Sequence, residues 1–201
     1  MKKLIFLIYF ATSLSSSSAQ ESYNITYVYL RWYPVYSKFL STINSRLLIK
    51  DSISYEYSYG DRDDVKSPYG KKFRGHSRYK NISSKLLLSQ SEPMGKPRYL
   101  IMDTIPTIKW DLHEEEKSVL NYTCKKASCT YNNMAYFAWY TGDIPLPFGP
   151  GLFGGLPGVI LELESTKSII TATTITKENV EIVQPNVGKK ITRKKLDDIK
   201  K

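Results

Sequence analysis

The chain has 201 residues, of which 41% are hydrophobic and 13% aromatic, and its formal net charge is +10 at pH 7. This composition supports one folded domain with a sizeable core and argues against a disordered chain. No run of 18 apolar residues occurs, which argues against a membrane-spanning helix. Much of the positive charge lies in residues 188–201, which contain seven Lys or Arg and two Asp.

The first 19 residues have the pattern of a secretory signal peptide. Two lysines precede the apolar run Leu4–Phe10, and a small-residue stretch ends at Ala19. We therefore expect a signal peptide over 1–19, one β domain over 20–187 and a basic tail over 188–201. Export to the periplasm, the outer membrane or the medium argues against nucleic acid as a partner. The tail is then expected to be solvated or to contact anionic membrane lipid or another protein.

Strand patterns dominate the amino-terminal half. Residues 24–33 (NITYVYLRWY) are predicted to form the first strand. Segment 35–46 is ambiguous between helix and strand, and the charged segment 59–81 is predicted to be an exposed loop. In 51–59, serines and a glutamate alternate with larger residues, which predicts a half-buried antiparallel strand. The residues expected on its buried face are Ile53, Tyr55, Tyr57 and Tyr59.

The carboxy-terminal half continues in the same way. Asn132-Asn133 is predicted to be a tight hairpin turn, because Asn tolerates the left-handed conformation. The pattern predicts a mainly β, single-domain protein whose curved antiparallel sheet, or open half-barrel, has little helix. Its expected strands in this half are 98–104, 107–112, 117–131, 134–144, 158–164, 167–176 and 180–185.

Residues 145–158 concentrate proline and glycine. Proline fixes φ and glycine permits positive φ, so this segment is predicted to form successive turns and not a flexible linker. Two interpretations stay open: a turn that plugs one end of the sheet, and the rim of a binding cavity. Both are possible because the segment carries large apolar side chains, at Leu146, Phe148, Leu152, Phe153 and Leu156.

Residues 155–163 (GLPGVILEL) resemble the signature of the GLPGLI family of exported bacterial proteins. Residues 117–127 (KSVLNYTCKKA) and 138–145 (AWYTGDIP) resemble two further segments of that family. The resemblance implies an exported cell-envelope protein with no established activity or cofactor. More distantly, it suggests a LolA-like curved sheet around an apolar cavity. The structural motif residues are Gly149, Pro150, Gly155, Leu156, Pro157 and Gly158.

These observations predict a non-enzymatic envelope protein that binds an apolar small molecule or an envelope protein in a sheet cavity rimmed by the Gly-Pro segment. Alternatives are a structural or interaction subunit of an envelope assembly and, less favoured, a copper-binding protein or an enzyme. No catalytic residue, metal ligand or cofactor is predicted. The candidate ligand-binding residues are Trp139, Phe148, Leu152, Phe153 and Leu156.

Cysteine and histidine give no firm chemistry. On one extended strand, Cys124 and Cys129 would lie roughly 16 Å apart, whereas bridged Cα atoms lie within about 7 Å. Free thiols are therefore favoured over a disulfide or a soft-metal site, and all three stay open. Asp111, His113 and Glu115 alternate and could hold a divalent ion, but a polar outer face explains them better.

Overall fold

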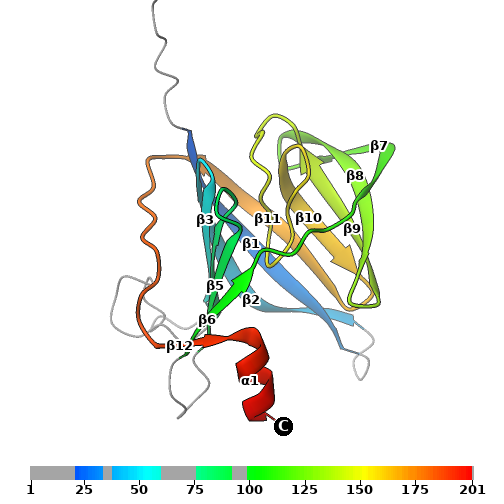
Figure 1. The fold of residues 1–201 in the computed structure, drawn as a ribbon. Helices are drawn as coiled ribbons and strands as arrows, with labels where there is room; N and C mark the ends of the chain where they lie inside the picture. The colour runs from blue at the N-terminus through cyan, green and yellow to red at the C-terminus, as the bar shows by residue number, and fades with distance from the viewer. Residues whose placement is uncertain (1–20, 34–37, 60–75, 92–98, 201) are drawn as a thin grey trace, which may run out of the picture.

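The computed structural model describes residues 21–33, 38–59, 76–91 and 99–200 (Figure 1). The predicted signal peptide, 1–19, lies outside the described residues. The described chain forms twelve strands and one short helix, α1 (Arg193–Lys200). The strands are β1 (Ser22–Tyr33), β2 (Lys38–Lys50), β3 (Ile53–Tyr59), β4 (His76–Asn81), β5 (Leu86–Ser91), β6 (Tyr99–Thr104), β7 (Asp111–Val119), β8 (Tyr122–Tyr131), β9 (Met134–Thr141), β10 (Val159–Ser165), β11 (Ser168–Lys177) and β12 (Lys189–Thr192).

All of these strands belong to one open sheet with the order β12-β6-β5-β4-β3-β2-β1-β11-β10-β9-β8-β7. Neighbours are antiparallel except β12 and β6, which run parallel. Register shifts within β1 and between β10 and β9 mark irregularities of the β-bulge kind, which bend strands and increase their twist. The sheet is strongly curved, and the loop between β9 and β10 lies in its hollow (Figure 1). The predicted fold class is confirmed.

The main core lies on the concave face. Ile25, Tyr27 and Leu47 from β1 and β2 are completely buried there. The loop between β9 and β10 contributes Phe148 and Leu156 to the same cluster. Burying a side chain of this size contributes about 2–3 kcal/mol, so the loop is an integral part of the core.

The opposite face of β3–β6 carries a second core. Tyr55, Tyr57 and Tyr79 are buried in it, and Ile182 packs against them. Segment 178–187, which contains Ile182, has no strand structure. The strand predicted over 180–185 is therefore wrong: this segment lays an apolar side chain on the sheet and does not pair with its edge.

Strand β3 is buried on both faces. Of the predicted buried face, Tyr55 and Tyr57 are buried and Ile53 is half-buried, whereas the side chain of Tyr59 lies outside the described residues. Ser54 and Glu56, expected on a wet face, are also inaccessible. The reason is that the loop between β9 and β10 covers their side of the sheet. The expectation of a half-buried strand is thus wrong for a tertiary reason that alternation in sequence does not contain.

Several boundaries also differ from expectation. The ambiguous segment 35–46 contributes to strand β2, and the end of the predicted loop 59–81 is strand β4, in the interior of the sheet. The predicted strand 117–131 is two strands, because Leu120 has φ 54° and turns the chain. Of the predicted strand 107–112, only the last two residues are in a strand, because β7 begins at Asp111. The hairpin turn at Asn132-Asn133 is confirmed, with φ of 49° and 59°.

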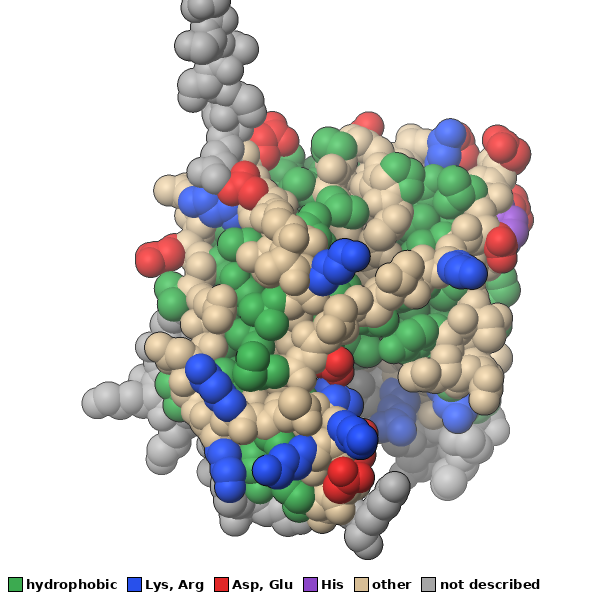
Figure 2. Space-filling view, viewed as in Figure 1, with side chains coloured by type: hydrophobic (Ala, Val, Ile, Leu, Met, Phe, Trp, Pro, Cys, Tyr) green, Lys and Arg blue, Asp and Glu red, His purple; other side chains and the backbone are tan. Residues whose placement is uncertain are grey.

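The basic carboxy-terminal segment is part of the fold. Its first residues form β12, and α1 follows directly. Ile191 and Leu196 are buried against Ile101 of β6. The expectation that this segment is solvated is therefore wrong for its apolar side chains. Its Lys and Arg side chains stay on the surface and gather over β12 and α1 (Figure 2). Within the described residues, no helix has the length and apolarity needed to cross a membrane.

Gly158, at the start of β10, is required by close backbone packing. A Cβ atom there would lie 1.9 Å from the carbonyl oxygen of Thr141, whereas a Cβ at Gly142 would meet nothing within 4 Å. We expect Gly158→Ala to lower the free energy of unfolding by about 3 kcal/mol, with Gly142→Ala close to wild type. Urea unfolding followed by tryptophan fluorescence measures both. Equal midpoints for the two variants would contradict this packing.

Candidate functional site

The Gly-Pro loop, residues 142–158, connects β9 to β10 and folds back on itself. The Phe148 amide donates to the Leu146 carbonyl at 2.8 Å, and the Gly155 amide donates to the Pro147 carbonyl at 3.0 Å. Gly155 has φ +85°, a conformation that L side chains rarely adopt. These turns leave several loop carbonyls without partners inside the loop.

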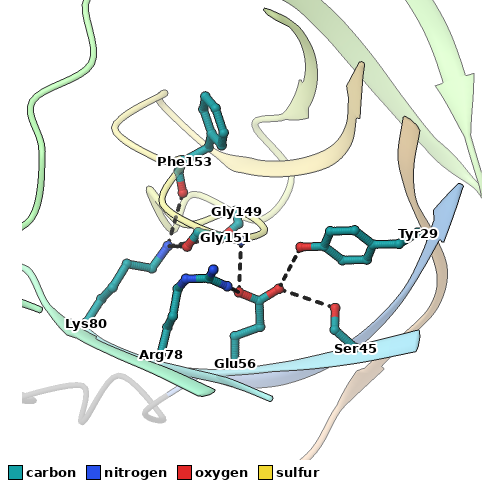
Figure 3. Close-up of polar contacts among 8 residues, drawn as sticks. All are labelled: Tyr29, Ser45, Glu56, Arg78, Lys80, Gly149, Gly151 and Phe153. Atoms are coloured by element: carbon teal, nitrogen blue, oxygen red, sulfur yellow. Dashed lines mark hydrogen bonds and ion pairs between the residues drawn. The ribbon is translucent and has the colours of Figure 1, made fainter. Parts of the chain in front are cut away.

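Lys80 supplies partners for three of those carbonyls. Its Nζ atom donates to the carbonyl oxygens of Gly149 at 3.0 Å, Gly151 at 3.3 Å and Phe153 at 3.1 Å (Figure 3). Lys80 projects from β4 and is only 2% exposed. An ammonium group has three donors and no acceptor, so this arrangement uses its full capacity.

Glu56 binds the same loop from the neighbouring strand β3. Its Oε2 accepts the Gly151 amide at 2.8 Å and lies 3.5 Å from Nη1 of Arg78. Its Oε1 accepts the hydroxyls of Tyr29 and Ser45, each at 3.3 Å (Figure 3). We call Lys80 and Glu56 the loop clamp, because one binds carbonyls and the other binds an amide of the same turn.

Burial sets the electrostatics of the clamp. Desolvation lowers the pKa of Lys80 to about 8, with Glu56 opposing this shift and Arg78 adding to it. Burial, and then the Glu56 carboxylate, raise the pKa of Tyr29 well above its usual value, which keeps its hydroxyl a donor. The clamp is therefore a satisfied polar network inside a largely apolar core.

A pocket of about 310 Å³ remains where the Gly-Pro loop meets the turn after β4 and the segment before β7. This is at the lower end of the size range of small-molecule sites. It is mostly apolar, and the polar residues in its lining are Lys80, Lys85 and Thr107. The lining residues are Lys80, Ile82, Lys85, Ile105, Pro106, Thr107, Ile108, Pro147, Phe148, Leu152, Phe153, Gly154 and Gly155.

The opposite face of β8–β10 carries a second feature. Ala138 and Leu163 are buried in the main core, so alternation turns their sequence neighbours to the other side of the sheet. The register pairs Trp139 with Glu162 on β10 and with Lys126 on β8. It pairs Phe137 with Glu164 on β10. We call this set the aromatic platform: Phe137, Trp139, Lys117, Lys126, Glu162 and Glu164.

The charges of the platform are paired. The Nζ atom of Lys117 binds Glu162 and lies 3.5 Å from Oε1 of Glu164. Nε1 of Trp139 donates to the same Glu164 oxygen at 3.1 Å. Burial raises the pKa of Glu162. Burial acts the same way on Glu164, but hydrogen bonds with Glu162 and Trp139 outweigh it and lower the pKa of Glu164, which is thus the better ionised acceptor.

The five predicted ligand-binding residues lie in three places. Phe148, Leu152 and Phe153 line the pocket. Leu156 is buried in the main core, and Trp139 belongs to the aromatic platform. The structure therefore does not bring the five together at one site. Of the motif residues, Gly149 and Pro150 lie next to the clamped turn at Gly151.

The clamp residues were missed by sequence reasoning. Lys80 fell in a segment predicted to be exposed, and Glu56 fell on the polar side of an alternating strand. The only local signal was the short alternation of Ser77 and Tyr79 with Arg78 and Lys80, in a stretch that the structure shows to be β4. Nothing in that pattern indicates that a loop seventy residues later covers it.

Cys124 and Cys129 are free, buried thiols. Burial raises the pKa of both to about 11. Nε2 of His113 lies 2.7 Å from the Ser128 hydroxyl, beside Glu115. No group of three or more His, Cys, Asp or Glu suited to a metal ion occurs among the residues that the structure describes.

The described chain is a curved β-sheet domain, and its sequence matches a known domain family. Residues 100–200, half of the chain, match the sequence model of the family described as "N-glycanase peptide, N-terminal domain". The chain belongs to this family. No curated protein compared with the chain matches it.

Two solved structures share the fold. The structure of PNGF-II in the C2 space group has a TM-score of 0.67 and 16% identity, over 89% of this chain and 32% of that one. The structure of PNGF-II in the P21 space group has a TM-score of 0.69 and 17% identity, over 89% of this chain and 33% of that one. The chain thus spans about a third of the length of the PNGF-II chains that it matches.

These findings correct the predicted family. The match is to the N-glycanase N-terminal domain, so the resemblance to the GLPGLI family and to LolA-like proteins is wrong. The envelope function predicted from it, including its apolar ligand, is wrong as well. The physical reason is that a Gly-Leu-Pro-Gly turn before a strand meets a local backbone requirement: the close approach at Gly158 demands glycine whatever the family.

The lowered pKa of Lys80 predicts a pH dependence of stability. In the unfolded chain this amine has a pKa near 10.5, so between pH 8 and 10.5 the folded protein binds fewer protons and becomes more stable as pH rises. Relative to Lys80→Met, the wild-type free energy of unfolding should rise by about 2 kcal/mol from pH 8 to pH 10. Urea unfolding across this range measures it.

Lys85→Met is the matched control, because Lys85 is exposed in the turn after β4. It should keep the wild-type slope. A Lys80→Met variant with the same slope as wild type would show that Lys80 titrates normally and would contradict its lowered pKa.

The two thiols should be poorly reactive in the folded protein. With a pKa of about 11, only about one thiol in a thousand is ionised at pH 8, and both are buried. We expect iodoacetamide to modify them at least about 100-fold more slowly than in urea-unfolded protein, as measured by mass spectrometry. Rapid modification of either thiol without denaturant would count against this environment.

Proposed function

We propose that this chain is a non-catalytic recognition domain of the N-glycanase type, which binds N-glycosylated protein. The family match over residues 100–200 carries this proposal, because the family is described by an enzyme acting on N-glycans and by its N-terminal domain. The likeness to about a third of PNGF-II supports a role as one domain among others. The signal-peptide pattern of residues 1–19 supports export to where glycoproteins of other organisms occur.

The geometry fits binding better than bond cleavage. The polar groups of the clamp, Lys80 and Glu56, are saturated by the loop and by neighbouring side chains. They therefore act on the protein itself and not on a substrate. The aromatic platform instead presents rings and charges on the surface, where a large glycoprotein can reach them.

Binding to one glycoprotein with and without its N-glycans tests the proposal. The glycoprotein is immobilised, one half is enzymatically deglycosylated, and binding of the purified chain is followed by biolayer interferometry. We expect binding to the glycosylated form to be at least ten-fold tighter, a difference of about 1.4 kcal/mol.

Released N-glycan added in solution should compete with the immobilised form. Equal affinity for the two forms, or no binding to either, would overturn the proposed function. A heat-denatured sample of the chain controls for adhesion of unfolded protein.

A further inference from the structure

We propose that the aromatic platform on β8–β10 binds a neutral pyranose ring of an N-linked glycan, an inference that rests on the proposed function. The platform combines exposed aromatic surface with paired charges on a regular sheet. Its chemistry and its rigidity each point to a sugar.

Exposed aromatic surface is the first requirement. Phe137 is 42% exposed, although it lies in the middle of a strand. Trp139, the next residue on the same face, is half-buried. Nζ of Lys117 lies over its ring, 4.4 Å from the ring centroid, and Nζ of Lys126 lies 5.9 Å from that centroid. A pyranose presents a flat C–H face, whose weakly positive hydrogens fit the electron-rich face of such rings.

Hydrogen-bonding groups at the ring edges are the second requirement. A sugar hydroxyl both donates and accepts, so it can bridge a carboxylate and an ammonium. The platform offers this pair twice. Glu164 lies next to Lys117, and Glu115 of β7 accepts from Nζ of Lys126 at 2.8 Å. Both carboxylates are more than a third exposed.

The platform is held in place before any ligand arrives. Nε1 of Trp139 is tied to Glu164, and the Thr171 hydroxyl of β11 donates to Oε2 of Glu162 at 3.2 Å. Because these side chains are already ordered, a ligand loses little of its binding free energy to fixing them. This rigidity favours an uncharged ligand with several hydroxyl groups, which can hydrogen-bond to side chains that are already in place.

Other ligand classes fit the platform less well. The carboxylates of Glu115, Glu162 and Glu164 would repel the phosphates of nucleic acid or anionic lipid. A peptide strand pairs with a sheet edge, whereas Phe137 and Trp139 lie two strands in from β7. A neutral sugar meets none of these obstacles.

The test measures binding to the glycosylated glycoprotein and to N,N′-diacetylchitobiose, the disaccharide that links N-glycans to asparagine. We expect Phe137→Ala and Glu164→Gln each to weaken both at least ten-fold. Ile199→Ala removes an apolar side chain from α1 that is 58% exposed, more than Phe137, and should bind as wild type. Circular dichroism and urea unfolding confirm that all variants are folded.

Tryptophan fluorescence gives a second readout. Chitobiose should perturb the emission of wild type, and Trp139→Phe should lose that change while keeping Trp32 and Trp110. This variant also removes the hydrogen bond to Glu164, so its affinity should fall with that of Glu164→Gln.

The pocket beside the Gly-Pro loop is the rival site. Leu152→Trp adds bulk to its lining and should leave binding unchanged. If Leu152→Trp abolishes binding while Phe137→Ala and Glu164→Gln do not, the platform inference is overturned and the proposed function stands. If the wild-type chain ignores the glycans of the glycoprotein, the proposed function fails and this inference falls with it.

Discussion

The hydrogen bonds from Lys80 to three carbonyls of the Gly-Pro loop are the interaction on which the rest of the structure depends. A chain rich in proline and glycine turns sharply but leaves carbonyls unpaired, and burying such groups without partners is costly. One ammonium with three donors pairs three of them at once. Glu56 adds the complementary contact to the Gly151 amide, so the loop can enter the core at an acceptable cost.

Because the Gly-Pro loop fills the hollow of the sheet, the two faces of the sheet have different roles. The concave face of β1, β2 and β8–β11 packs against Phe148 and Leu156 and becomes a core. The other face of β3–β6 is covered by segment 178–187, through Ile182. The outer face of β8–β10 carries aromatic and charged side chains, with Phe137 exposed. This is the surface that we propose as the glycan-binding site.

The motif resemblance shows what a short pattern can and cannot carry. The turn before β10 needs glycine at Gly158 because Thr141 passes within contact distance. Any sheet that takes a plugging loop between two antiparallel strands can impose the same need. The Gly-Leu-Pro-Gly pattern therefore predicted the local backbone and the start of β10, and it misled about the family and its ligand.

Sequence alone determined part of the local structure. Alternation in 51–59 suffices to predict strand β3, and the two asparagines at 132–133 suffice to predict the turn between β8 and β9, because side-chain direction and φ are local properties. Only the tertiary structure decided which charges are buried. Lys80 and Glu56 look solvated in their own segments, and they become the clamp because the loop at Gly149–Phe153 folds across strands about seventy to ninety residues earlier.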